Sequence, residues 1–108
     1  MVETTPQLAE IIVRYTDQLQ KMGIHVERVM LFGSYASGTP HEGSDIDLVI
    51  VSSDWKKYND IERLETLGIA AGRIMEPVEA IGVTPEEIAM HKLSPFWEQV
   101  LSEQAVVV

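Results

Sequence analysis

Apolar residues recur with a helical period at the start of the chain. Pro6 suits the first position of a helix, and it follows Thr5, a residue type that caps helix N-termini. Gly23 is of the type found just after a helix ends. Between them, the apolar positions are spaced to form one stripe: Leu8, Ile11, Ile12, Tyr15 and Leu19. The pattern predicts a helix that begins at Pro6, ends before Gly23 and packs against a sheet.

Three short apolar segments favour strands, at residues 26–32, 45–51 and 77–83. Gly33 ends the first segment, residues 34–37 are expected to begin a short helix, and residues 38–44 have the composition of a loop. In the second segment, Ile46, Leu48 and Ile50 would share one face of the strand. Its second half is apolar on both faces, which is typical of a central strand.

Further helices are indicated towards the C-terminus. After a polar turn at residues 52–57, Asn59 or Asp60 could cap a helix reaching about Arg73. Thr84-Pro85-Glu86-Glu87 is a capping box, and Ser94-Pro95 is expected to begin a last helix. The apolar tail, residues 105–108, suits a short strand or a partner-binding end. In the helix after Asn59 we expect four inward residues: Ile61, Leu64, Leu67 and Ile69.

This order of elements predicts an α/β (α+β) fold, with a small sheet and helices packed on one face. The 108 residues suggest a single domain covering positions 1–108. No apolar run is long enough to span a membrane, and the N-terminus predicts no signal peptide. The absence of cysteine excludes disulfides and thiolate metal sites, and it is compatible with a cytoplasmic protein.

Seventeen acidic residues against eight basic ones give a net charge of -9. Such a surface repels extended DNA or RNA, whereas the charge of one nucleoside triphosphate can be carried by metal ions. The charge also suits a basic protein partner, although acidic surfaces often do no more than keep a small protein soluble.

Candidate chemistry lies around the second strand. Asp45 and Asp47 are two residues apart, so their carboxylates would lie side by side and repel each other unless a cation sits between them. Hard oxygen ligands suit Mg²⁺. Gly33 and Ser34 could offer backbone N–H groups and a hydroxyl to a phosphate. The plain alternatives are a solvated strand end for the aspartates and a helix N-cap for Ser34.

Taken together, Gly33-Ser34, then Gly38, then Ser44-Asp45-Ile46-Asp47-Leu48 resemble the signature of the nucleotidyltransferase superfamily that includes DNA polymerase beta. The chain length resembles the minimal nucleotidyltransferase (MNT) branch. The resemblance implies a mixed sheet and a two-metal site, in which Asp45 and Asp47 hold Mg²⁺, with Mn²⁺ as a substitute. Gly33, Ser34 and Ser44 would then bind the triphosphate.

The resemblance also implies a third acidic residue on the next strand, usually Asp, and the matching position is Glu79. Its own sequence context agrees, because a charge within an apolar strand is costly unless it is paired or metal-bound. The alternative is an edge-strand residue that faces water. In the family this carboxylate commonly serves as the base, so the longer Glu could weaken or re-tune the chemical step. Glu76 is the weaker candidate.

What the resemblance implies for function is transfer of a nucleoside monophosphate, AMP from ATP, to an acceptor hydroxyl. In the minimal branch the usual partner is a small helical protein of the HEPN family. The chain would then be the antitoxin of a toxin–antitoxin pair, and it would neutralise the HEPN toxin by masking it or by adenylylating it.

Two alternatives to this function stay open. One is a small-molecule enzyme similar to the aminoglycoside-modifying branch, with a homodimer building the acceptor site. The other is a binding module that has lost turnover.

Other polar and aromatic residues have plainer interpretations. His41 and Glu42 suit a surface loop, and His25 and His91 suit structural roles. Lone aromatic side chains such as Trp55 and Tyr58 usually serve packing, and the Phe96-Trp97 pair is interpreted as core or interface rather than as a nucleotide pocket. Four basic residues could neutralise phosphate charge, and nothing in the sequence selects among them: Lys56, Lys57, Arg63 and Arg73.

Overall fold

A computed structural model describes residues 6–39 and 45–107. Its elements in chain order are α1 (Pro6–Lys21), β1 (Arg28–Phe32), α2 (Gly33–Ser37), β2 (Ile46–Val51), the 3-10 helix η1 (Ser53–Lys57), α3 (Asp60–Ile74), β3 (Val78–Val83), α4 (Pro85–Ala89), α5 (Pro95–Gln99), the π-helical turn η2 (Val100–Gln104) and β4 (Val106–Val107). The expected helices and strands are present, with most ends shifted by one or two residues. The expected cap Thr5 lies outside the described residues.

The sheet is mixed and has the strand order β3-β2-β1-β4. β1 runs antiparallel to β2 and to β4, whereas β2 and β3 are parallel. The apolar tail therefore forms a strand, in which Val106 and Val107 pair with Leu31 and Met30. The central position of β2 confirms the prediction made from its two apolar faces.

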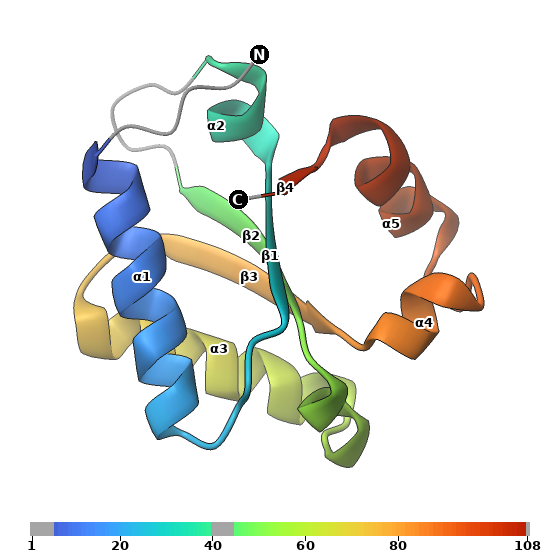
Figure 1. Ribbon diagram of the computed structural model, residues 1–108, viewed down its shortest axis with the longest axis horizontal. Coiled ribbons are helices and arrows are strands. Elements are labelled where there is room, and N and C mark those ends of the chain that lie inside the picture. Colours follow the sequence, from blue (N-terminus) through green and yellow to red (C-terminus); the bar gives the residue numbers. More distant parts are fainter. Residues whose placement is uncertain (1–5, 40–44, 108) are drawn as a thin grey trace.

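Both faces of the sheet are covered, because β2 is apolar on both (Figure 1). The long helices α1 and α3 lie on one face, as expected, and pack against Ile46, Leu48 and Ile50. The short C-terminal helices lie on the opposite face, which the sequence did not lead us to expect. The second, smaller core there contains Val49 and Val51 of β2 together with residues from β1, β3 and the C-terminal segment: Met30, Val83, Ile88, Leu93, Trp97 and Leu101.

The inward face of α3 differs from the prediction. Leu67 is buried as expected, but Ile61, Leu64 and Ile69 are 67%, 57% and 49% exposed. Small side chains take their place, because α1 approaches closely and the Tyr15 hydroxyl donates a hydrogen bond of 2.9 Å to the Leu67 carbonyl. The buried stripe of α3 is Leu67, Ala70, Ala71 and Ile74.

Local capping explains where the later helices begin. Asn59 and Glu62 form a capping box at the start of α3, and Thr84 and Glu87 form the one predicted at the start of α4. The Ser94 hydroxyl accepts a hydrogen bond from the Trp97 N–H at the start of α5. In the part of the chain that is described, no helix has both the length and the apolar character needed to cross a membrane.

Candidate functional site

Strand pairing brings the predicted acidic residues to one end of the sheet. In the parallel pair of β2 and β3, Asp47 lies opposite Glu79. On the other side of β2, Asp47 lies opposite Phe32, the last residue of β1. Side chains alternate between the two faces along β2 and β3, so Asp47 and Glu79 lie on the face of the smaller core. Asp45 comes just before β2, two residues before Asp47, and is expected on the same face. Asp45 and Glu79 are exposed, and Asp47 is partly buried.

The electrostatics show that the three carboxylates act on one another. The pKa of Glu79 is raised. The causes, largest first, are a hydrogen bond with the Asp45 side chain, the charge of Asp45, slight burial and the charge of Asp47. Burial and then the charge of Asp45 raise the pKa of Asp47. Asp47 and Glu79 are therefore easier to protonate than free carboxyls, Asp47 mainly because of burial and Glu79 mainly because of Asp45.

Gly33 lies directly against Asp47. Its φ of 71° belongs to the left-handed region that glycine adopts readily. A Cβ placed on Gly33 would overlap the Asp47 carboxylate, with the carboxyl carbon only 3.0 Å away. This glycine therefore serves two purposes, since it makes the turn from β1 into α2 and leaves room for the acidic side chain.

Ser34 lies within α2 and not at its N-cap. The N-cap position is Phe32, so the alternative interpretation of Ser34 as a capping residue is wrong. The Ser34 carbonyl accepts hydrogen bonds from the Thr39 N–H at 2.9 Å and the Ser37 hydroxyl at 3.1 Å. Its own hydroxyl is partly exposed, and no hydrogen bond joins it to another described residue. Ser44, His41 and Glu42 lie outside the described residues.

A divalent cation fits the chemistry of this donor set. Within residues 6–39 and 45–107, no three or more His, Asp or Glu side chains are already converged as a set of metal ligands. Nevertheless, Asp45, Asp47 and Glu79 supply only hard oxygen donors, and their mutual repulsion is what a bound cation would relieve.

The basic and aromatic candidates from the sequence are mostly occupied elsewhere. Arg63 is 12% exposed in its side chain and pairs with Glu87 at 2.8 Å. Its guanidinium also donates to three backbone carbonyls, those of Tyr58, Gly82 and Trp55. Trp55 is fully buried and donates to the Ile50 carbonyl at 3.0 Å, which confirms its interpretation as a packing residue. Arg63 thus holds the fold together and cannot also neutralise a phosphate.

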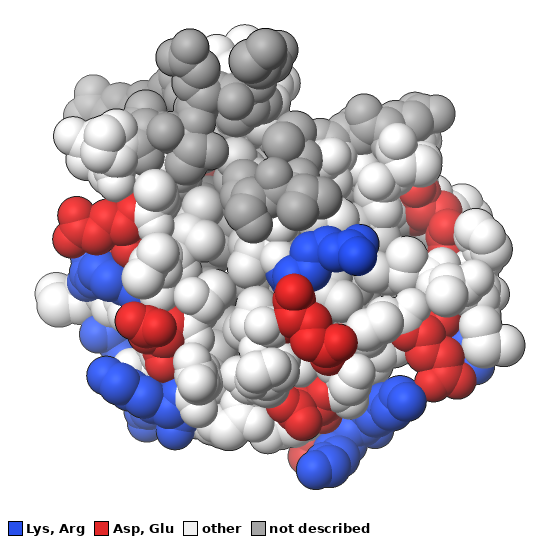
Figure 2. All heavy atoms as spheres, in the orientation of Figure 1, with Lys and Arg blue, Asp and Glu red and all other residues white. Residues whose placement is uncertain are grey.

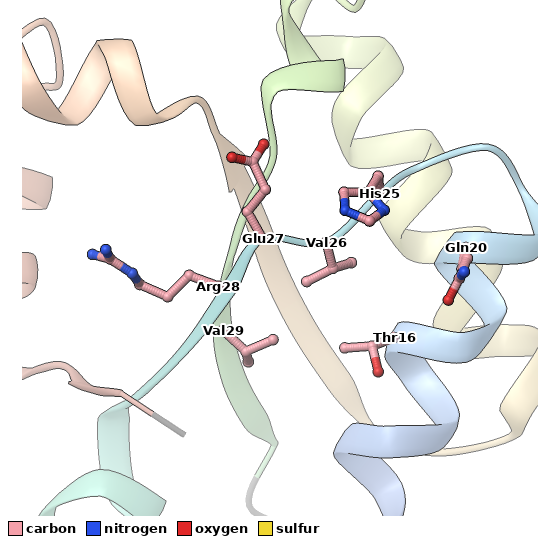
Figure 3. Close-up of a pocket in the computed structure, with 7 residues that line it drawn as sticks. All are labelled: Thr16, Gln20, His25, Val26, Glu27, Arg28 and Val29. Carbon is pink, nitrogen blue, oxygen red and sulfur yellow. The ribbon is translucent and has the colours of Figure 1, made fainter.

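Other hollows of the described surface are not lined by Asp45, Asp47 or Glu79. Figure 2 shows basic side chains on this face separated by acidic and uncharged ones. Figure 3 shows the side chains that line a shallow cavity between Thr16 and Gln20 of α1 and the segment from His25 to Val29. The volume of this cavity is about 290 Å³. Its Glu27 carboxylate already accepts a hydrogen bond from the Ser53 N–H at 2.5 Å. Hydrogen bonding with Ser53 lowers the pKa of Glu27, so this carboxylate has a structural partner.

Comparisons with known proteins identify the family and the fold of the chain. The family model described as "Nucleotidyltransferase domain" matches residues 10–102. Among solved structures, a protein from Sulfolobus solfataricus described as a nucleotidyltransferase is similar, with a TM-score of 0.64 and 20% identity, over 94% of this chain and 78% of that one. No curated protein sequence matches the chain.

Two further similar structures are toxin–antitoxin complexes. One, described as a toxin–antitoxin with AMP-PNP, has a TM-score of 0.59 and 24% identity over 86% of this chain and 68% of that one. The other is described as a tri-AMPylated Shewanella oneidensis HEPN toxin with its MNT antitoxin. Its TM-score is 0.52, with 21% identity over 92% of this chain and 66% of that one. At these identities the similarity shows a shared fold.

Proposed function

Because the chain belongs to the nucleotidyltransferase domain family, we propose that it transfers the nucleoside monophosphate of a nucleoside triphosphate, AMP from ATP, to an acceptor hydroxyl. The observation that carries this proposal is the position of Asp47, opposite Glu79 and against Gly33, with Asp45 two residues before it. A carboxylate cluster next to a turn with exposed donors can hold a cation and a phosphate at the same place.

Each residue then has a defined role. Asp45, Asp47 and Glu79 would hold Mg²⁺, for which Mn²⁺ can substitute. When bound, divalent metal ions neutralise the triphosphate and stabilise the attacking and leaving oxygens of a displacement at phosphorus. The backbone N–H groups at Gly33 and the hydroxyls of Ser34 and Ser44 would bind and orient the triphosphate.

Glu79 is the proposed base. The acceptor oxygen forms a bond to the α-phosphorus, the bond from that phosphorus to the pyrophosphate oxygen breaks, and the hydroxyl proton passes to the Glu79 carboxylate. Its exposure leaves Glu79 accessible to an acceptor that approaches from solvent.

For the biological setting, we propose a cytoplasmic antitoxin of the MNT type that acts on a small helical HEPN-family toxin. The fold similarity to the MNT antitoxin in complex with an AMPylated HEPN toxin supports this choice. The net charge of -9 suits a basic partner. Neutralisation would occur by adenylylation of a hydroxyl on the toxin.

A second candidate is a binding module that retains the site with little turnover. The observation in its favour is Glu79 itself, a residue one methylene longer than the usual Asp. Such a module would bind nucleotide and toxin and would act by masking alone.

Transfer of label from ATP to the partner distinguishes the nucleotidyltransferase from the binding module. The protein is incubated with Mg²⁺, the product of the adjacent reading frame, and ATP labelled at either the α- or the γ-phosphate. We expect label on the partner only from α-labelled ATP, and none with the Asp45→Asn/Asp47→Asn double variant. Nucleotide binding without any transfer would favour the binding module. Transfer of the γ-label, or equal transfer by the double variant, would refute the assigned reaction or site.

A further inference from the structure

Three aromatic rings form a continuous series that starts beside the carboxylates. Phe32 is the cross-strand partner of Asp47. Its ring meets that of Trp97 edge to face, with centroids 5.3 Å apart and planes at 90°. The Trp97 ring meets that of Phe96 in the same manner, at 5.0 Å and 81°. We call Phe32, Trp97 and Phe96 the aromatic cluster.

Packing alone does not account for this cluster. Phe96 is 63% exposed, although it belongs to a helix that covers the smaller core. Phe32 and Trp97 are only partly buried. The other aromatic pair of the chain behaves differently, since Trp55 is fully buried and lies edge to face with Tyr58. An aromatic ring in water gives up the stabilisation that burial would provide, unless a ligand covers it.

The aromatic cluster and the carboxylates lie on the same face of the sheet. Phe32 and Trp97 pack against the core that contains Val49 and Val51, the residues that follow Asp47 on its own side of β2. In Figure 1, α5 stands beside the end of β1 from which α2 begins. A nucleotide held by its phosphates at Asp47 could therefore extend its ribose and base over Phe32 towards α5.

We propose that the aromatic cluster is the nucleobase subsite of the protein, with the base stacking on Trp97 and Phe96; this inference rests on the nucleotidyltransferase function proposed above. Stacking on aromatic faces tolerates different bases, because every base has a π-face. Purine nucleoside triphosphates, which have the larger π-face, are the ligand class, and ATP and GTP bind with similar affinity. Trp97 also packs against the smaller core, in agreement with its interpretation from the sequence.

The test compares two ligands that differ by the nucleoside. Dissociation constants for ATP and for inorganic tripolyphosphate, each with Mg²⁺, are measured on the wild type and on the Phe96→Ala, Trp97→Leu and Met90→Ala variants. Met90 is the control, because it is 58% exposed and lies outside the cluster. The ratio of the two constants is the quantity compared, since a general loss of folded protein weakens both ligands alike.

We expect Trp97→Leu to reduce the preference for ATP over tripolyphosphate by about 5- to 150-fold, the range found for single base–aromatic stacks. Phe96→Ala is expected to reduce it less, and Met90→Ala not at all. Tryptophan fluorescence gives a second readout, because ATP should quench Trp97 and leave the buried Trp55 unchanged.

The outcomes distinguish the two proposals. Equal affinity of the wild type for ATP and tripolyphosphate, or an unchanged ratio in both aromatic variants, would overturn the base subsite while leaving the phosphate site intact. Failure of the wild type to bind either ligand would overturn the proposed function, and the base subsite with it.

Discussion

Asp47 and Glu79 lie directly opposite each other in the parallel pair of β2 and β3, and each has a raised pKa. Residues far apart in the sequence thus meet at the end of the sheet where Gly33 makes its turn. Folding holds these like charges together, and the proposed cation would relieve their repulsion. The experiments below test this relationship.

Comparing Gly33→Ala with Gly38→Ala should separate the effect of backbone strain from the effect of a methyl group placed against Asp47. Gly33→Ala and Gly38→Ala both force alanine into a left-handed backbone, at φ 71° and 77°, and each should lower the free energy of unfolding by about 1–2 kcal/mol. Only at Gly33 would the new methyl group overlap Asp47, because nothing lies within 4 Å of a Cβ at Gly38.

Urea unfolding and ATP titration with Mg²⁺ would measure both effects. We expect the two variants to lose similar stability, or Gly33→Ala somewhat more, and only Gly33→Ala to lose nucleotide affinity. Equal nucleotide affinity in both variants would show that contact between Gly33 and Asp47 does not shape the site.

Replacing Glu79 by Gln should change how stability depends on pH. The folded-state pKa of Glu79 is raised above its ordinary value of 4.5, so the ionised group destabilises the native state at neutral pH. As the pH falls through the folded pKa towards 4.5, the wild type takes up a proton more readily when folded and gains stability relative to Glu79→Gln. Unfolding free energies of both proteins from pH 7 to pH 4 would measure this difference, and the opposite slope would contradict the proximity of Glu79 to Asp45.

Shortening Glu79 tests whether the site turns over. Glu79→Asp restores the acidic residue usual in the superfamily and keeps the charge. We expect transfer activity to be retained or raised, by far less than the roughly 10²–10⁴-fold that a general base contributes as a whole. An inactive wild type that becomes active with Asp would identify the natural protein as a binding module. Loss of activity with Asp would instead indicate a site built around the longer side chain.

Arg63 should matter for stability and not for nucleotide binding. Removing its guanidinium in Arg63→Ala leaves Glu87 and three backbone carbonyls without their partner, at an expected cost of about 2–4 kcal/mol of unfolding free energy. The control is Lys56→Ala, which breaks the exposed 3.1 Å pair with Glu86 and should cost about 0–1 kcal/mol.

Chemical denaturation of both variants gives the comparison, with nucleotide affinity measured on the folded protein. An Arg63→Ala variant as stable as Lys56→Ala would contradict the structural role. Normal stability with lost nucleotide affinity would assign Arg63 to the phosphates after all.

Much of this fold could be predicted from local sequence signals. The capping box at Thr84 and the proline at the start of the first helix place their helices correctly, because caps act within one turn. The apolar character of both faces in the second half of residues 45–51 correctly predicts a central strand. These signals do not depend on which distant segment packs against them.

The parts that were missed depend on distant contacts. On α3, large residues were expected to face inward, but the close approach of α1 selects Ala70 and Ala71 and leaves Ile61 and Leu64 in water. The occupation of Arg63 by backbone carbonyls also has no signature in the sequence.

For the site, the sequence indicated which acidic residues to consider, and the pairing of β2 with β3 places Asp47 opposite Glu79. The contact of Gly33 with Asp47 could not be read from the sequence, because it follows from the geometry of the turn.

Nucleotide binding that depends on Mg²⁺ tests the central claim most directly. The melting temperatures of the wild type and of the Asp45→Asn/Asp47→Asn variant are measured with and without Mg²⁺ and ATP. Ligands that bind only the native state raise the melting temperature, by an amount equivalent to about 2.7 kcal/mol at 100 times the dissociation constant. We predict a rise for the wild type, only when both ligands are present, and none for the folded double variant. An equal rise in both proteins, or none in the wild type, would contradict the assignment of this site.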